Sequence, residues 1–277
     1  MTGTPFIKMH GLGNDFVVVD GRARPFRPDA ALVCAIADRR TGVGCDQLIV
    51  IEPPRGRFDG VFMRIFNADG GEAEACGNAA RCVARLVMDE TGASAATVET
   101  LAGVLRARAT ADGRVVVDMG PARDGWRDIP LARAADTLHL GIVEDGLKDP
   151  VAVGVGNPHA VFFVADVAKV PLETCGPVIE RHPLFPQRTN VEAVQVLAPD
   201  RLRVRVWERG AGLTRACGSG ACAALVAAHR RGLAGREAQV ILDGGPLGIA
   251  WTDDGHVHLA GPTAVSFTGA LDPSLDA

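Results

Sequence analysis

The 277-residue chain has no tyrosine, only three lysines, and no apolar run near the roughly 20 residues that a membrane span requires. Pyridoxal phosphate enzymes need a lysine for their Schiff base. Lys148 and Lys169 lie in polar or irregular context, and Lys8 lies in no motif for that cofactor. The net charge is −4 and the basic residues are scattered, without the concentrated patch typical of nucleic-acid binding. We therefore expect no membrane, no nucleic acid and no pyridoxal phosphate.

The start of the chain lacks the charged, apolar and small-residue pattern of a secretory signal. Seven cysteines, an odd number, are then read as reduced thiols, and we expect a cytoplasmic protein. There is no Cys-x-x-Cys, and no histidine stands at ligand spacing from the closer cysteine pairs, so we expect no metal site. Hydrophobic residues make up 47% and charged residues 22%, which is typical of a globular protein.

Short β-branched and apolar runs bounded by Gly, Pro, Asp or Asn predict many strands. Helices are fewer: we expect them near 29–39, 78–90 and 219–231, the last two ending before glycines. This pattern predicts a strand-rich α+β fold rather than a regular βαβ alternation. The predicted strands are 16–20, 47–52, 61–66, 96–100, 104–109, 114–119, 151–155, 160–164, 191–197, 202–207, 239–242, 248–251 and 256–259.

An internal duplication is the most informative feature. At a shift of 141 residues, the segment 75–80 (ACGNAA) falls on 216–221 (ACGSGA), and 64–67 (RIFN) falls on 205–208 (RVWE). At a shift of 143, Gly11–Asn14 falls on Gly154–Asn157. The repeats predict two similar halves that face one another across a cleft. We place the first half at 1–120, completed by a return of about 262–277, and the second at 121–261.

Each copy places a cysteine, Cys76 or Cys217, just before a predicted helix. There the unpaired N–H groups and the helix dipole lower a thiol's pKa and bind anions such as carboxylates. Asn78 and Ser219 suit the role of helix caps. One such cysteine alone would be read as a small buried residue. Two in matching contexts favour function, whereas Cys34, Cys45, Cys82, Cys175 and Cys222 are read as ordinary thiols.

Two thiols facing each other suggest a definite chemistry. One thiolate removes a proton from a stereocentre, and the opposite thiol returns a proton to the other face. Two matched groups are needed because substrate and product are mirror images at that carbon. The helix N-termini would bind the adjacent carboxylate and stabilise the charge that develops on it.

Six segments together resemble the diaminopimelate epimerases, in that family's order, and the resemblance runs from about residue 6 to about 270. They are 8–16 (KMHGLGNDF), 42–47 (GVGCDQ), 67–82 (NADGGEAEACGNAARC), 156–162 (GNPHAVF), 188–192 (RTNVE) and 206–222 (VWERGAGLTRACGSGAC).

The resemblance implies a cofactor-independent isomerase that interconverts LL- and meso-diaminopimelate in lysine and peptidoglycan precursor synthesis. It implies two pseudo-symmetric domains, each a curved, mostly antiparallel sheet around a central helix, with the active site in the cleft between them, and a homodimer. By matching position, Cys76 and Cys217 are the acid–base pair, and His159 and Glu208 tune the thiols or hold the reacting amino group. The remaining implied substrate-binding residues are Asn14, Gln47, Asn67, Gly77, Asn78, Asn157, Asn190, Arg209, Gly218 and Ser219, with Glu208 among them.

Phe267 stands near a C-terminal aromatic, often tyrosine, that the family uses in its dimer contact, so a contact through that hydroxyl is absent. Three alternatives stay open at this point. A proline-racemase-like enzyme also uses paired cysteines, but would not need the asparagine set or Glu208-Arg209. A phenazine-biosynthesis-type isomerase lacks the paired thiols. A non-catalytic amino-acid-binding module would be expected to have lost one cysteine.

Overall fold

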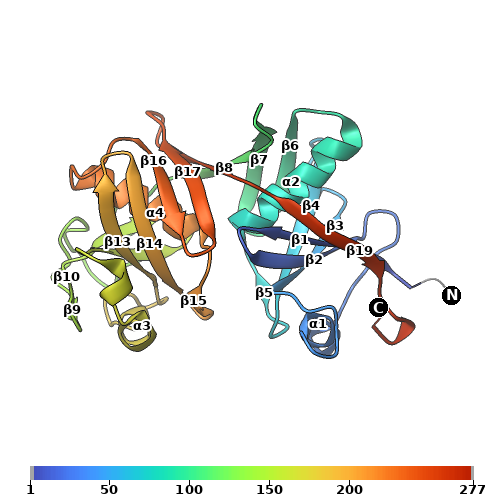
Figure 1. Ribbon diagram of the computed structural model, residues 1–277, viewed down its shortest axis with the longest axis horizontal. Helices are drawn as coiled ribbons and strands as arrows, with labels where there is room; N and C mark the ends of the chain where they lie inside the picture. Colours follow the sequence, from blue (N-terminus) through green and yellow to red (C-terminus); the bar gives the residue numbers. More distant parts are fainter. Residues whose placement is uncertain (1–2, 276–277) are drawn as a thin grey trace. The chain divides into compact units, whose positions relative to one another are not determined.

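The computed structural model describes residues 3–275 and divides the chain into two compact units. The first unit comprises the chain up to Val117 together with the segment from Gly261 onward, and the second comprises Asp118–Ala260. In Figure 1 the first unit runs from blue through cyan to green, with the red end of the chain returning to it, and the second unit runs from green through yellow to orange-red. Each unit is described on its own below.

The first unit is a curved sheet of mixed parallel and antiparallel strands. Strand β1 pairs antiparallel with both β2 and β19; β2 pairs parallel with β3, and β3 antiparallel with β4. β4 pairs antiparallel with β5 and parallel with β6, and β6 pairs antiparallel with β7. Its elements are β1 (Pro5–Gly11), β2 (Asn14–Asp20), α1 (Ala30–Ala37), β3 (Gln47–Glu52), β4 (Val61–Asn67), β5 (Glu72–Ala73), α2 (Gly77–Thr91), β6 (Ala95–Thr100), β7 (Gly103–Ala109) and β19 (Ala264–Ala270).

Strand β8 (Val115–Pro121) carries the chain into the second unit. There β11 and β12 form an antiparallel pair, β12 and β13 a parallel pair, and β13 and β14 an antiparallel pair. The further elements are β9 (Val143–Glu144), β10 (Leu147–Lys148), β11 (Val151–Gly154), β12 (Pro158–Phe163), α3 (Leu172–Glu180), β13 (Asn190–Ala198), β14 (Arg201–Glu208), β15 (Gly212–Thr214), α4 (Gly218–Arg230), β16 (Glu237–Leu242), β17 (Gly245–Trp251) and β18 (His256–Gly261), with 3₁₀ turns at Val167–Lys169 and Pro273–Leu275.

The two units repeat one pairing order. β2–β3–β4–β6–β7 corresponds to β12–β13–β14–β16–β17, with the same alternation of parallel and antiparallel pairs. In both, the strand that ends the antiparallel pair leads through a short strand, β5 or β15, into the helix α2 or α4. The predicted α+β, sheet-dominated fold with a duplicated strand–loop–helix segment is confirmed.

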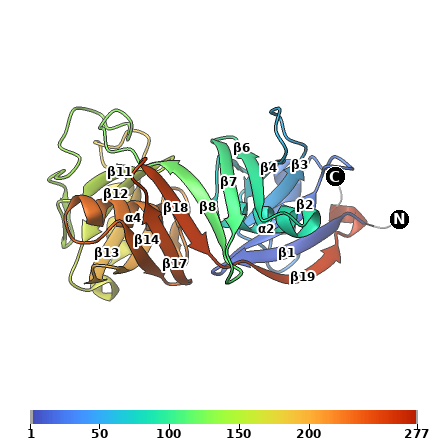
Figure 2. The ribbon, with the colours of Figure 1, turned by 90° about the horizontal axis from the view of Figure 1, so that it is seen from above.

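Each unit's long helix lies against its sheet, as Figure 2 shows for α4 among β11 to β14 and β17. In α4, small alanines with Leu225 and Val226 are buried almost all round, as expected of a helix enclosed by a sheet. In α2 the first two turns, Asn78 to Ala84, are buried all round, and of the residues beyond them Met88 is buried. It ends at Gly92, whose φ of 70° is the left-handed conformation that favours glycine. Within the described residues, no helix combines the length and apolar character needed to cross a bilayer.

The sequence prediction missed several elements. Strands β1 and β19 were not expected, although the return of the chain after residue 262 was. Helix α3 was also missed, because Gly176 and Pro177 in its middle read as loop residues. The helix expected at 29–39 is shorter, Ala30–Ala37, with Asp29 as its N-cap accepting from Leu32 N at 2.8 Å.

Candidate active site

Asn14 is the hub of the predicted site residues in the first unit. It opens β2, and its Oδ1 accepts a hydrogen bond from Asn78 Nδ2 at 3.0 Å. The same oxygen lies 3.8 Å from Cys76 Sγ, close enough to accept the thiol hydrogen. Asn14 Nδ2 donates to Asp46 Oδ2 at 2.9 Å, which fixes the orientation of the amide. The fold thus brings together Asn14, Cys76 and Asn78, although about 60 residues separate the first from the other two.

Gln47 and Asn67 form a second contact in the same unit. They are opposite one another at the start of β3 and the end of β4. Gln47 Nε2 donates to Asn67 Oδ1 at 2.9 Å, and both side chains are half-buried. Gln47 is also the register partner of Phe16, which is two residues after Asn14. The side-chain amides of Gln47 and Asn14 therefore lie near the same end of the neighbouring strands β3 and β2.

An ion-pair cluster holds the strand end that carries Asn14. Asp15 accepts from Lys8 and from Arg39, and Arg39 also bonds Asp46 at 2.8 Å. Lys8 is buried and donates as well to the Gly44 carbonyl. Burial opposes ionisation of Asp15, but the hydrogen bonds from Arg39 and Lys8 outweigh it and lower its pKa to about 2. Asp15 is therefore ionised at neutral pH and ties β2 to the loop before β3.

In the second unit, Cys217 occupies the N-cap of α4. Its Sγ accepts from the Gly220 backbone N–H at 3.4 Å and lies 3.6 Å from Ser219 Oγ. Cys76 holds the equivalent N-cap of α2. The expectation that Asn78 and Ser219 are the caps is wrong, because both helices begin one residue earlier, at Gly77 and Gly218. The cysteines themselves take the cap position, and Asn78 and Ser219 lie in the first turn.

The expectation of a lowered thiol pKa is also wrong for Cys217 in this structure. Cys217 is 4% exposed, whereas Cys76 is half-buried. Burial raises the pKa of Cys217 well above its usual value, and the nearby Glu208 and Glu192 carboxylates raise it further. The hydrogen bonds from Gly220 and Ser219 act in the opposite direction but do not outweigh these effects. Cys217 is therefore a protonated thiol at neutral pH.

His159 of the second unit is completely buried. It sits in β12 opposite Asn190 of β13. Its Nδ1 is 2.7 Å from Glu192 Oε1, and its Nε2 is 2.7 Å from Asn157 Oδ1. Each ring nitrogen is thus held by one polar side chain, Glu192 at Nδ1 and Asn157 at Nε2.

Glu208 is the last residue of β14, and Arg209 follows it directly. Glu208 accepts a hydrogen bond from the Thr214 hydroxyl, and the Arg209 backbone N–H donates to Asn190 Oδ1 at 2.9 Å. Asn190 Nδ2 donates in turn to the Pro158 carbonyl at 3.0 Å. The Arg209 side chain is exposed and donates to the Gln187 carbonyl at 3.1 Å. The buried Asn190 side chain therefore links the backbone at Pro158 to the backbone at Arg209, whose own side chain lies at the surface.

Two acidic residues of this region were not predicted. Glu192 contacts His159, and Glu180 at the end of α3 accepts from Trp207 Nε1 at 2.7 Å and Gly210 N at 3.3 Å. Both are buried, at 0% and 3% exposure. For Glu192 a signal was present: a carboxylate within an apolar strand pattern is rarely buried without a partner. For Glu180 there was none, because α3 itself was missed.

None of the other five cysteines occupies the N-cap of a helix. Burial raises the pKa of Cys45 to about 11 and that of Cys82 to about 12. Cys175 and Cys222 are also buried, and Cys34 is exposed. All seven cysteines are thiols. Among residues 3–275, no group of three or more His, Cys, Asp and Glu side chains is placed to hold a metal ion.

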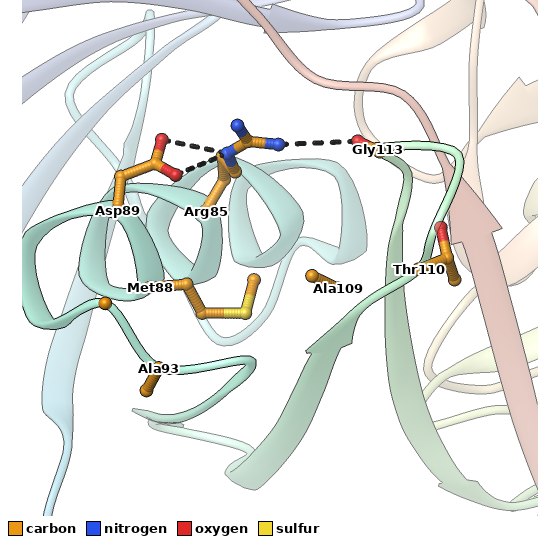
Figure 3. Close-up of a pocket in the computed structure, with 8 residues that line it drawn as sticks. Arg85, Met88, Asp89, Ala93, Ala109, Thr110 and Gly113 are labelled. Carbon is orange, nitrogen blue, oxygen red and sulfur yellow. Dashed lines mark hydrogen bonds and ion pairs between the residues drawn. The ribbon is translucent and has the colours of Figure 1, made fainter.

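A surface hollow between the end of α2 and β7 contains none of the predicted site residues (Figure 3). Its one basic side chain, Arg85, is paired with Asp89 at 2.8 Å, and its Nη1 reaches the Gly113 carbonyl at 3.5 Å. Because Asp89 already neutralises Arg85, the hollow offers no charge to a ligand.

Comparison with known proteins supports the predicted resemblance. A family model described as diaminopimelate epimerase matches residues 6–124 and 151–265. A diaminopimelate epimerase of Rhodospirillum centenum is 61% identical over 98% of this chain and 93% of its own length. One from Acidiphilium cryptum is 56% identical over 98% of this chain and 97% of its own length.

Solved structures share the fold at low sequence identity. A probable proline racemase from Agrobacterium radiobacter has a TM-score of 0.71 and 16% identity, covering 98% of this chain and 93% of its own. A phenazine biosynthesis protein from Bacillus anthracis has a TM-score of 0.69 and 14% identity, covering 98% and 100%. These likenesses establish a common fold. The family match and the relatives of 56–61% identity are far more specific, and the chain belongs to the diaminopimelate epimerase family.

Proposed function

We propose that Cys76 and Cys217 are the acid–base pair with which this isomerase interconverts LL- and meso-2,6-diaminopimelate. The observation that carries the proposal is their equivalence: each thiol holds the N-cap of the long helix in its unit. One thiolate takes the α-proton and the other thiol returns a proton to the opposite face, and the roles exchange with direction. The reaction requires one thiol at each face of the same carbon.

The substrate's reacting carboxylate would bind at the two helix starts. Gly77 with Asn78, and Gly218 with Ser219, supply first-turn N–H groups, where the helix dipole favours an anion. The charge that develops on this carboxylate as the proton leaves is stabilised by the same groups. Glu208 and His159 would hold the reacting amino group or tune the thiols.

The distal end of diaminopimelate carries a second carboxylate and a second ammonium. Arg209, exposed and flanked by Asn190, would bind the carboxylate. The amide oxygens and N–H groups of Asn14, Gln47, Asn67 and Asn157 would complete the binding of the polar groups. This set distinguishes the proposed substrate from proline, which has no distal charges to satisfy.

The proposal includes no cofactor. Thiol bases remove the proton directly, and the carbanion is stabilised by the helix starts rather than by pyridoxal phosphate. We further propose a cytoplasmic protein, in keeping with seven cysteines that are all thiols.

We propose also that the protein is a homodimer that associates through β19. Val265 and Phe267 on this strand are 54% and 50% exposed, an unusual exposure for large apolar side chains. Phe267 packs edge-on against Phe6, with ring centroids 6.0 Å apart, so the aromatic surface is fixed in place.

The Cys76→Ala and Cys217→Ala variants test the acid–base pair. Each should lower epimerisation at least a hundredfold, the usual contribution of a positioned acid or base, while the fold is retained. The assay is incorporation of solvent deuterium into LL- and meso-diaminopimelate under reducing conditions, with circular dichroism as the check on folding. Cys34→Ala, at an exposed thiol, is the matched control and should keep full activity. Full activity in either site variant would exclude the two-thiol mechanism, and label entering proline instead would favour a proline racemase.

A further inference from the structure

Glu192 is a completely buried carboxyl group that no part of the proposed mechanism uses. It lies in β13, where its register partners are Val161 on one side and Val206 on the other. Its Oε1 is 2.7 Å from His159 Nδ1, and both side chains are 0% exposed. Its Oε2 is also buried and has no hydrogen-bond partner among the described residues. A carboxylate buried in apolar surroundings is costly unless a positive group offsets it.

Glu192 also stands beside the Cys217 thiol. A Cβ built on Gly220 would lie 2.9 Å from Glu192 Oε1 and 3.2 Å from Cys217 Sγ. The oxygen and the sulfur therefore border the same small space, no farther apart than the sum of those distances. Any side chain at position 220 would fill this space, so the glycine is what allows the carboxyl group to face the thiol.

Three titratable groups face Glu192 from the elements packed against it: His159 from β12, Glu208 from β14 and Cys217 from the start of α4. Burial raises the pKa of Glu192, and Glu208 adds to this, whereas His159 acts in the opposite direction. The same two carboxylates follow burial among the causes that raise the pKa of Cys217. Glu192 is thus placed between its hydrogen-bond partner His159 and the Cys217 thiol.

We propose that Glu192 is a positioning residue of the Cys217 site: anchored by His159, its carboxyl group stands beside the Cys217 thiol and sets how strongly that thiol holds its proton. The inference rests on the proposed function and deepens it. A negative charge on this carboxyl group adds to burial and to Glu208 in holding the proton on Cys217. Since the equilibrium constant of the overall reaction is fixed, a change at Glu192 must alter kcat/KM equally in both directions.

The pH dependence of alkylation tests this in the full chain without substrate. Iodoacetamide reacts with the thiolate, and mass spectrometry of the peptide that carries Cys217 gives the rate at each pH. In the plot of alkylation rate against pH, a change in access to the sulfur alters the maximum rate at high pH. A change in the proton affinity of the thiol alters the pH at which the rate is half-maximal, which is the midpoint. Glu192→Gln keeps the acceptor for His159 Nδ1–H and removes the charge, so the midpoint for Cys217 should fall by about one pH unit or more.

Glu180→Gln is the matched control, since Glu180 is another buried glutamate of the second unit and is held by Trp207 and Gly210. Its substitution should leave the Cys217 midpoint in place. An unchanged midpoint in Glu192→Gln, or an equal shift in Glu180→Gln, would overturn the inference. Neither outcome depends on epimerase activity, so failure of the proposed function is detected separately, by the deuterium assay.

A measurement on the unsubstituted protein keeps the inference testable if Glu192→Gln does not fold. Nitrogen-15 NMR of the histidine rings reports which nitrogens carry protons. A charged Glu192 anchored by His159 requires a proton on Nδ1 of that ring at pH 7. A bare Nδ1 would mean that the carboxyl group is itself protonated and donates the hydrogen bond, which contradicts the inference.

Discussion

At the scale of single residues, the ion pairs of Asp15 stabilise the end of β2 that carries Asn14. Asp15 is 17% exposed in its side chain and is bonded by both Lys8 and Arg39. These cations lower its pKa from 3.8 to about 2. A carboxyl group whose pKa is lowered on folding stabilises the fold above its unfolded pKa, and this stabilisation is lost as the pH falls through the folded pKa.

Asp15→Asn should therefore lower the free energy of unfolding by about 2 kcal/mol at pH 7. The difference from the unsubstituted protein should shrink as the pH falls from about 4 to about 2, and urea unfolding at a series of pH values measures it. Asp20→Asn is the control, because Asp20 pairs with Arg22 at the surface and its side chain is 50% exposed. An equal loss of unfolding free energy in both variants, or a loss that does not depend on pH, would contradict a stabilising role for the ionised Asp15.

At the scale of elements, helix α3 packs against the end of β14, where Glu208 and Arg209 lie. Trp207 lies directly on α3: a Cβ at Gly176 would be 2.6 Å from Trp207 Cγ. The indole N–H is held by Glu180, the last residue of the same helix. Helix and strand end therefore fit together only with glycine at position 176.

Gly176→Ala should push Trp207 away and displace the turn that follows it. Forcing a methyl group into such a contact costs about 1–3 kcal/mol of stability. Because the turn carries the proposed contact to the distal carboxylate, KM for diaminopimelate should rise more than kcat falls. Steady-state kinetics with both stereoisomers measures this. Gly235→Ala, where a Cβ would meet only backbone atoms at 3.9 Å and beyond, is the control. A change in kcat alone, with KM unchanged, would show that α3 does not support the binding of the distal carboxylate.

The elements could be predicted where the sequence pattern is local. The segment Ala75–Ala80 and its copy 141 residues later gave both long helices and the cysteines before them. α3 could not be predicted, because Gly176 and Pro177 have poor helix propensity, and Gly176 is required by the close packing of the helix against Trp207. The same holds at the site: Asn14 meets Cys76, and Glu192 meets His159, only because strands distant in sequence pair side by side. The thiol pKa was predicted with the wrong sign for Cys217, because burial and two carboxylates outweigh the helix start.

At the scale of the whole molecule, the proposed dimer depends on the exposed face of β19. Phe267→Asp places a charge in the middle of this apolar surface, so the variant should sediment as a monomer, whereas the unsubstituted protein should sediment as a dimer. Leu101→Asp is the control: Leu101 is 47% exposed and lies between β6 and β7, outside β19. Dimers that persist in Phe267→Asp would exclude β19 as the contact.

The return of the chain after Gly261 closes the first unit. β19 pairs along the length of β1, and Leu271 just beyond it is 2% exposed within the core of Phe6, Val17 and Val33. Leu271→Ala should cost about 2–5 kcal/mol, as for other buried leucines. Because that core belongs to the first unit, hydrogen exchange should quicken in β1, β2 and β19 and stay unchanged in β13 and β14. Val265→Ala, at an exposed position of β19, should change neither the free energy of unfolding nor the hydrogen-exchange rates. Exchange that quickens equally in both units would instead mean that the duplicated halves unfold as one cooperative body.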